Sequence, residues 1–181
     1  MKTHHSFNAK TRGFTLIEML VTITIIVILA GLSLGGFKYV TAKQASEQAK
    51  IQTQLLSKAL EEYKLDNGNY PVTGNTATGN SNLLYQELYL NGTGANPTGK
   101  IYLAELDPDN NKQGWTQAAG QVMTLIDPWQ NEYYYLSAKT ATGTANSNAI
   151  NPDFDLYSAG PDGRTAQVPT DPAVKDDINH F

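Results

Sequence analysis

The chain has 181 residues, a formal net charge of −4 and no cysteine. This length suits one domain with an appendage, and the lack of cysteine excludes a disulfide framework, a thiolate metal site and a cysteine nucleophile. The acidic balance, together with the lack of a basic run or an RNA-binding motif, predicts no nucleic acid among the partners.

The N-terminal region combines a basic flank with a long apolar segment. Residues 1–13 carry three basic residues and no acidic one, whereas residues 14–37 are mostly apolar and have Glu18 as their single charge. A helix rises about 1.5 Å per residue, so the apolar segment could cross a hydrocarbon core of roughly 30 Å. Basic flanks stay in the cytoplasm. We therefore expect residues 14–37 to cross a membrane once; they could be a simple anchor, although an anchor has no need of Glu18.

The junction of the two segments, residues 13–18, reads GFTLIE. This motif, after a basic leader and before an apolar stretch, resembles the type IV pilin superfamily, which includes the pseudopilins of type II secretion. The resemblance implies that residues 1–13 are a leader, removed by a prepilin peptidase that cuts between Gly13 and Phe14. It also implies that Phe14 becomes an N-methylated N-terminus.

The same resemblance implies a role for Glu18 in assembly. Its carboxylate would neutralise the free amine of Phe14 in a neighbouring subunit of the filament. Each of these charges would cost several kcal/mol if it were buried alone, so their pairing would fix the register of each incoming subunit. The alternative is a glutamate that only snorkels to the cytoplasmic interface.

An amphipathic pattern continues through residues 38–66 and is followed by the stop signal Asp66-Asn67-Gly68. We predict one helix from about Thr15 to about Leu65, with either a bend or close packing near Gly35 and Gly36. The second half of this helix should lie on a globular body. The predicted contact stripe consists of Ala42, Ala45, Ala49, Leu56, Ala59, Leu60 and Tyr63.

Residues 67–120 form a variable region that is rich in loop-forming residues. Residues 83–88 predict a short helix that packs on the long one. Asp107, Asp109 and Asn111 alternate as at the start of a calcium loop, but Lys112 stands where such a loop needs glycine. A solvated turn is therefore the favoured interpretation.

Residues 121–181 contain three β-prone segments, at 122–126, 132–137 and 154–158. They predict a small antiparallel sheet packed on the long helix, with Trp129 and the neighbouring tyrosines in the core. The fold class is therefore α+β.

Three sequence blocks in this region, DPWQNEYYY, DLYSAGPDG and DDINHF, are similar to the major pseudopilin of type II secretion. The resemblance implies a type IV pilin-like fold and a calcium ion bound by the C-terminal loop. The ligands would be the side chains of Asp162, Asp176 and Asp177 and the carbonyl of Ala159. Hard oxygen donors of this kind suit calcium. Without that resemblance, a flexible acidic tail would be the favoured interpretation.

The resemblance implies a structural subunit that polymerises into the type II secretion pseudopilus, which drives export of folded proteins from the periplasm. Its partners would be further copies of the chain, minor pseudopilins, an inner-membrane platform protein and an assembly ATPase. The protein would span the inner membrane once, with its body in the periplasm. A type IV pilin for adhesion, motility or DNA uptake is the alternative. No enzymatic activity is expected, because the sequence has no GxSxG, phosphate-loop or zinc-site spacing.

Overall fold

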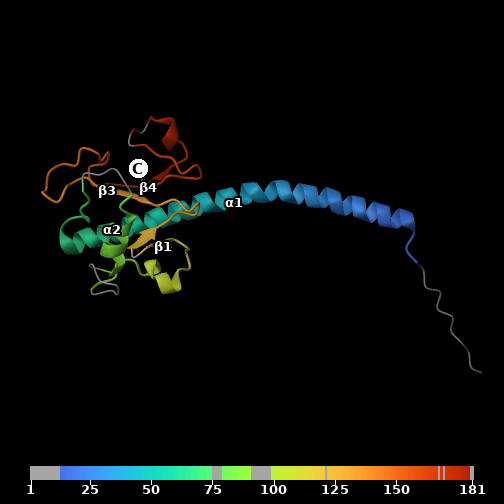
Figure 1. Ribbon diagram of the computed structural model, residues 1–181, viewed down its shortest axis with the longest axis horizontal. Coiled ribbons are helices and arrows are strands. Elements are labelled where there is room, and N and C mark those ends of the chain that lie inside the picture. Colours follow the sequence, from blue (N-terminus) through green and yellow to red (C-terminus); the bar gives the residue numbers. More distant parts are fainter. Residues whose placement is uncertain are drawn as a thin grey trace, which may run out of the picture. The chain divides into compact units, whose positions relative to one another are not determined.

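The structure is a computed structural model that describes residues 13–74, 79–90, 99–120, 122–166, 168 and 170–179. Most of the predicted leader (residues 1–12) and the last two residues of the DDINHF block lie outside the described residues. The chain divides into two compact units, Met1–Ala42 and Lys43–Phe181 (Figure 1).

The first unit contains the beginning of helix α1, Leu16–Asn67. Its large apolar side chains face outward, with Phe14, Leu16 and Ile17 exposing 76%, 83% and 65% of their surface. Among the residues that the structure describes, no helix combines the length and the mean hydropathy that a membrane crossing requires. Exposed apolar surfaces of this extent mark contacts with membrane or protein.

Helix α1 has the predicted bounds to within two residues and is helical through Gly35 and Gly36. Its end is set by Gly68, which has a φ of +80° and donates its backbone N–H to the carbonyl of Lys64 at 2.7 Å. A residue in the left-handed conformation directly after the last turn ends a helix, and glycine adopts that conformation without steric cost.

The second unit is built around the second half of α1. Ala49, Leu56, Ala59 and Leu60 are buried, which confirms the centre of the predicted stripe, whereas Ala42 is exposed. Ala45 and Tyr63, also predicted in the stripe, are half-buried. Two polar residues of α1, Gln52 and Thr53, are buried as well. Gln52 is satisfied because the hydroxyl of Tyr133 donates to its Oε1 at 2.7 Å.

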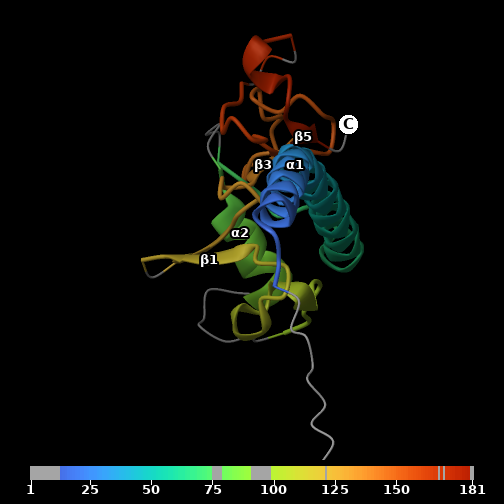
Figure 2. The same ribbon diagram turned by 90° about the vertical axis from the view of Figure 1, so that its right-hand side faces the viewer.

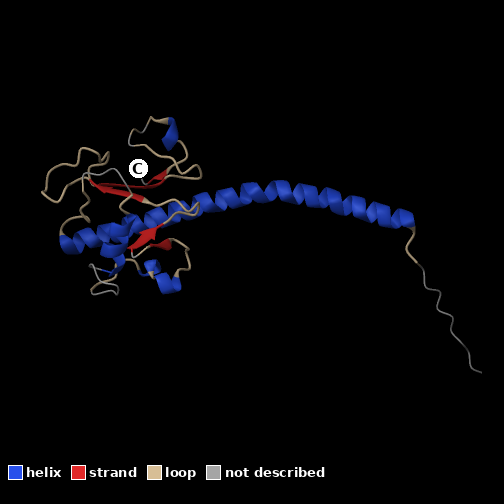
Figure 3. Cartoon of the chain, in the orientation of Figure 1, coloured by secondary structure: helices blue, strands red, loops and turns tan. Residues whose placement is uncertain are grey.

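The strands form two antiparallel sheets rather than the single sheet predicted (Figure 3). One is the hairpin of β1 (Thr116–Ala119) and β2 (Val122–Leu125). The other has the order β3-β4-β5, with β3 at Tyr134–Ser137, β4 at Phe154–Ser158 and β5 at Ile178–Asn179. The sequence predicts β2, β3 and β4 but neither β1 nor β5.

Short helical segments occupy the variable region. Helix α2, Ser81–Tyr85, continues into a π-helical turn, Gln86–Leu90, and together they cover the predicted helix at 83–88. Two 3₁₀ turns follow, at Ala104–Leu106 and Pro108–Asn110. A third, at Pro172–Val174, lies outside the variable region. The turn around Asp109 is exposed to solvent.

The tryptophan of the core is Trp115 and not Trp129. Trp115 is fully buried, and its indole N–H donates to the carbonyl of Glu105 at 2.8 Å. Trp129 is half-buried and lies outside the core cluster. Tyr133 and Tyr135 are buried as predicted. The turn that holds Trp129 instead contacts the C-terminal loop.

Candidate functional site

The start of α1 is closed by a reciprocal pair of side chains, Thr15 and Glu18. Glu18 Oε2 accepts hydrogen bonds from the backbone N–H of Thr15 at 2.8 Å and from its hydroxyl at 2.7 Å. The hydroxyl oxygen of Thr15 in turn lies 3.3 Å from the backbone N–H of Glu18 and accepts from it. This is a capping box, in which two otherwise unpaired helix N–H groups find side-chain partners. The carboxylate of Glu18 therefore has a local partner within its own chain.

The predicted cleavage point lies directly before this capping box. Gly13 is exposed, and a β-carbon placed there would meet no atom within 4 Å. Phe14 exposes 76% of its surface. Neither residue is in the helix, which begins at Leu16. The bond between Gly13 and Phe14 thus lies in exposed backbone outside the helix.

A polar network centred on Asp127 supports the C-terminal loop. Asp127 is 1% exposed, and its Oδ1 accepts the backbone N–H groups of Trp129 and Asn131 at 2.9 and 2.8 Å. Its Oδ2 accepts the hydroxyl of Ser158 at 2.6 Å. Buried carboxylates persist when they are satisfied in this way. The network fastens the DPWQN turn to the end of β4.

Asn131 and Gly160 extend this network into the predicted metal loop. The side-chain amide of Asn131 donates to the carbonyl of Gly160 at 2.8 Å. Gly160 has a φ of +64°, and a β-carbon there would collide with the backbone carbonyl of Asp176. Only glycine combines this conformation with such a close approach. Gly160 thereby brings the chain before Asp162 against the chain at Asp176.

The predicted calcium ligands belong to the C-terminal segment of the second unit, which Figure 2 draws in orange and red. The backbone N–H of Asp162 donates to Asp176 Oδ2 at 3.3 Å, and Thr165 donates its hydroxyl to Asp177 Oδ2 at 2.7 Å. Ala159 is fully buried at the end of β4. Within the described part of the chain, no three histidine, cysteine, aspartate or glutamate side chains converge as a metal-binding group.

Asp177 carries an electrostatic imbalance. Its Oδ1 is buried and has no hydrogen-bond partner. Burial raises the pKa of Asp177 to about 6. The hydrogen bond from Thr165 opposes this rise, and the charges of Asp176 and Asp162 add smaller increases. A carboxylate that is partly desolvated beside two others lacks a counter-charge.

Two features of these sites were not predicted from the sequence. The capping box could have been recognised from the T-x-x-E spacing of Thr15 and Glu18 at the helix start. For the Asp127 network, the sequence offers a weaker indication, which is the turn-forming DPWQN segment. Its partner Ser158 lies 31 residues away in the chain, and short-range patterns do not indicate such a contact.

The long N-terminal helix, the small antiparallel sheets packed on its second half and the GFTLIE motif define a type IV pilin-like protein. Residues 8–34 match the family model for the prokaryotic N-terminal methylation motif. The chain is 31% identical to type II secretion system core protein G of Escherichia coli K12, over 95% of this chain and 92% of that protein. Identity to core protein G of Pseudomonas aeruginosa is 33%, over 84% of each chain.

The chain belongs to the family of type II secretion system core protein G. A more limited similarity connects it to a fimbrial protein of Neisseria meningitidis, with 35% identity over 72 residues. That match covers 40% of this chain and 42% of the fimbrial protein.

Proposed function

We propose that the chain is the major structural subunit of a type II secretion pseudopilus and catalyses no reaction. The observation that carries this proposal is the similarity to core protein G along nearly the whole chain, body as well as N-terminal motif. The subunits would polymerise through the exposed apolar part of α1 and present their bodies on the outside. The filament would drive folded proteins out of the periplasm.

Before assembly, the subunit would span the inner membrane once through residues 14–37, with its body in the periplasm. A prepilin peptidase would cut after Gly13 and leave Phe14 as the methylated N-terminus. The methylation motif at residues 8–34 supports this step. Minor pseudopilins, an inner-membrane platform protein and an assembly ATPase would be the further partners.

Glu18 would change partners during assembly. In the unassembled chain its carboxylate accepts two hydrogen bonds from Thr15. After cleavage, the amine of Phe14 in a neighbouring subunit would offer a positive charge in an apolar filament core. An ion pair in that apolar core gains more than the hydrogen bonds from the uncharged donors of Thr15 that it replaces.

Replacing Glu18 with alanine should therefore abolish filaments. The buried amine of Phe14 would lose its counter-charge, which costs several kcal/mol per subunit. Filaments would be sheared from cells that express the secretion machinery, and then quantified by immunoblot and electron microscopy. Thr22→Ala is the matched control, because the Thr22 hydroxyl donates to the carbonyl of Met19 within its own helix. Normal filament yield from Glu18→Ala would contradict the role proposed for Glu18.

We propose further that the C-terminal loop binds calcium through Asp162, Asp176 and Asp177, with the carbonyl of Ala159 as a backbone ligand. The unpaired buried oxygen of Asp177 and its raised pKa support this assignment, since both indicate a missing positive charge. A bound calcium ion would supply that charge and tie the loop to β4. The three side chains would have to converge further on binding, which a loop of this polarity permits.

Calcium should raise the melting temperature of the full chain in detergent relative to excess chelator. A ligand at 100 times its dissociation constant stabilises by about 2.7 kcal/mol, or roughly 5–10 °C for a chain of this size. The variant Asp176→Asn should lose most of this shift. The control Asp171→Asn, on the same loop, should keep it. Equal melting temperatures with calcium and with chelator would overturn the metal assignment.

A surface pilus subunit is the second candidate, and the match to the fimbrial protein of Neisseria meningitidis favours it. That match covers less than half of either chain, whereas the match to core protein G of Escherichia coli covers more than nine-tenths of both. Deletion of the gene separates the two: loss of protein export supports the pseudopilus, and loss of surface filaments with intact export supports the pilus.

A further inference from the structure

A cavity of about 250 Å³ opens in the second unit beside the end of α1. Its lining includes two cationic side chains, Lys64 and Lys139, together with Tyr70, Thr140 and Asp153. The unit as a whole is acidic, with nine Lys and Arg against sixteen Asp and Glu in residues 43–181. A cavity with two cations and one anion is therefore a local exception on this surface.

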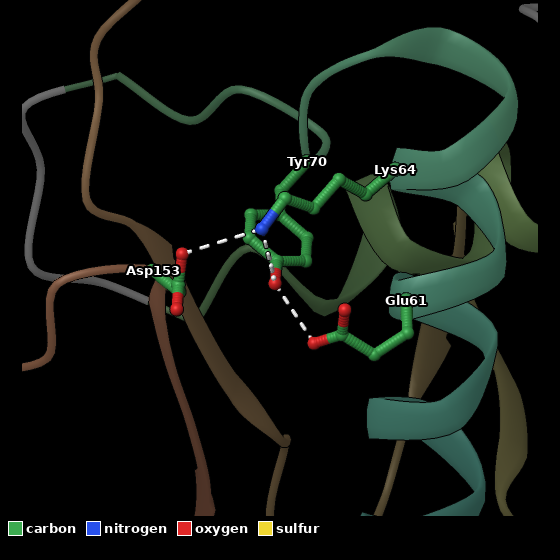
Figure 4. A network of polar contacts seen from close by, with 4 residues as sticks. All are labelled: Glu61, Lys64, Tyr70 and Asp153. Atoms are coloured by element: carbon green, nitrogen blue, oxygen red, sulfur yellow. Dashed lines mark hydrogen bonds and ion pairs between the residues drawn. The ribbon is translucent and has the colours of Figure 1, made fainter.

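Lys64 is held in position on the cavity wall by a set of polar contacts (Figure 4). Its Nζ lies 3.1 Å from the hydroxyl of Tyr70 and 3.5 Å from Asp153 Oδ1, and it sits 4.4 Å from the centre of the Tyr70 ring. The hydroxyl of Tyr70 donates to Glu61 Oε1 at 2.8 Å. These contacts fix the ammonium of Lys64 at the cavity instead of leaving it on a freely moving side chain.

Lys139 adds a charge that is not neutralised locally. Its side chain is exposed and makes no ion pair with any residue that the structure describes. A second hollow of about 400 Å³ adjoins the first and shares Lys139, Gly143 and Pro152 with it. The loop at residues 138–152 thus contributes to the walls of both hollows, and Lys139 borders each of them. We call this region the cationic end.

The same unit contains a turn at residues 104–111, which we call the acidic turn. It carries Glu105, Asp107 and Asp109, none of which forms an ion pair within the described chain. The turn is anchored by Leu106, which is fully buried, and Asp107 Oδ1 accepts the backbone N–H of Asp109 at 3.0 Å. Glu105 and Asp109 are exposed.

The two features lie at different levels along α1. The segment that follows the acidic turn is tied to the helix at Gln48, whose side-chain amide donates to the carbonyl of Gln113 at 3.0 Å. The cationic end is at Lys64, sixteen residues further on, which corresponds to about 24 Å of helix. Figure 1 shows the loop at 138–152, in orange, beside the end of α1, and the acidic turn, in yellow-green, further back along it.

We propose that, in the filament, the cationic end of one copy receives the acidic turn of another copy further along. This contact rests on the filament proposed above. When helices assemble in parallel, the end of one body at Lys64 faces the end at Gln48 of a following body. The contact joins two different surfaces, so it is heterologous, and in a helical filament it repeats from copy to copy. Complementary charges at this point offset the repulsion between acidic bodies.

Charge exchange tests the contact in the full chain. Lys139→Glu should lower the yield of sheared filaments by roughly tenfold, since it places like charges opposite each other. Asp109→Lys should act in the same way, and the double variant should restore most of the yield. The control Lys112→Glu makes the same change of charge next to the acidic turn and should assemble normally. Wild-type yield from Lys139→Glu would overturn the proposal.

Cross-linking gives a second test, because the chain contains no cysteine. On oxidation, Lys139→Cys combined with Asp109→Cys should give a ladder of covalent oligomers from assembled filaments, while each single variant can give at most dimers. Filaments that form normally but yield no ladder would overturn this contact and leave the pseudopilus assignment intact. Failure of the unaltered chain to form any filament would overturn both.

Discussion

Asp177 holds a carboxylate whose charge is unfavourable in the absence of a cation. One carboxylate oxygen accepts the hydroxyl of Thr165, while the other is buried without a partner. Asp176 and Asp162 add negative charge nearby. A folded protein retains such an unfavourable group when the group serves binding, and the proposed calcium ion would be its ligand. Asp127 shows the contrast, because hydrogen bonds satisfy both of its buried oxygens.

The pH dependence of stability in chelator follows from the same group. The pKa of Asp177 is raised from 3.8 to about 6 in the folded chain, so the folded state binds this proton more readily than the unfolded state does. The free energy of unfolding should therefore rise as the pH falls from about 7 towards about 4. The measurement is the difference in melting temperature between wild type and Asp177→Asn, both in excess chelator.

At neutral pH in chelator, Asp177→Asn should melt at a higher temperature than the wild type. This advantage should shrink on acidification, because protonation removes the same charge that the substitution removes. With saturating calcium the sign should reverse, since the bound cation requires the ionised carboxylate. A difference that stays constant between about pH 7 and about pH 5 in chelator would contradict the imbalance at Asp177.

The element that organises the body is the second half of α1. Leu56 and Leu60 are fully buried in the core cluster. Leu65, little more than one turn beyond Leu60, exposes 84% of its surface to solvent. The helix therefore contributes to stability through one face. The polar pair of Gln52 and Tyr133 adds a specific contact within that apolar face.

Leu60→Ala should lower the free energy of unfolding of the body by about 2–5 kcal/mol, because it removes buried apolar surface and leaves a cavity. Leu65→Ala is the matched control on the same helix and should change stability by less than about 0.5 kcal/mol. Chemical denaturation of the full chain in detergent, followed by circular dichroism, measures both. Similar losses for the two variants would contradict the packing of this face.

The elements that the sequence predicts are those with a strong local pattern. Helix α1 has regular apolar spacing and a glycine stop, and β4 alternates within a β-prone segment. The strand β1, with the sequence TQAA, has little β-propensity of its own and forms because it pairs with β2. The strand β5 is only two residues long and depends on its pairing with β4. Such elements are set by tertiary contacts.

The candidate sites also differ in how far local sequence predicts them. Gly13, Phe14 and Glu18 belong to one continuous motif, so the sequence alone indicates them. The convergence of Asp162 with Asp176 depends on Gly160, whose close approach to the Asp176 carbonyl only a structure reveals. The tryptophan assignment failed for a related reason: both tryptophans lie near turns, and only the packing against α1 and β2 distinguishes Trp115 as core.

At the scale of the whole molecule, the two units have complementary properties. The first exposes apolar side chains from Phe14 to Val40, and the second is acidic and holds the core. A filament with the first units in its centre buries the apolar surface and leaves the acidic bodies around it. The proposed contact between the cationic end and the acidic turn then joins these bodies to one another.

Electron cryo-microscopy of filaments assembled from the unaltered chain would examine both proposed sites at once. The proposed assembly predicts parallel α1 helices in the centre, with Glu18 of one copy beside the N-terminal amine of Phe14 in another. It also predicts density for an ion in the loop that holds Asp162, Asp176 and Asp177. Filaments with the bodies in the centre, or Glu18 distant from every Phe14 amine, would contradict it.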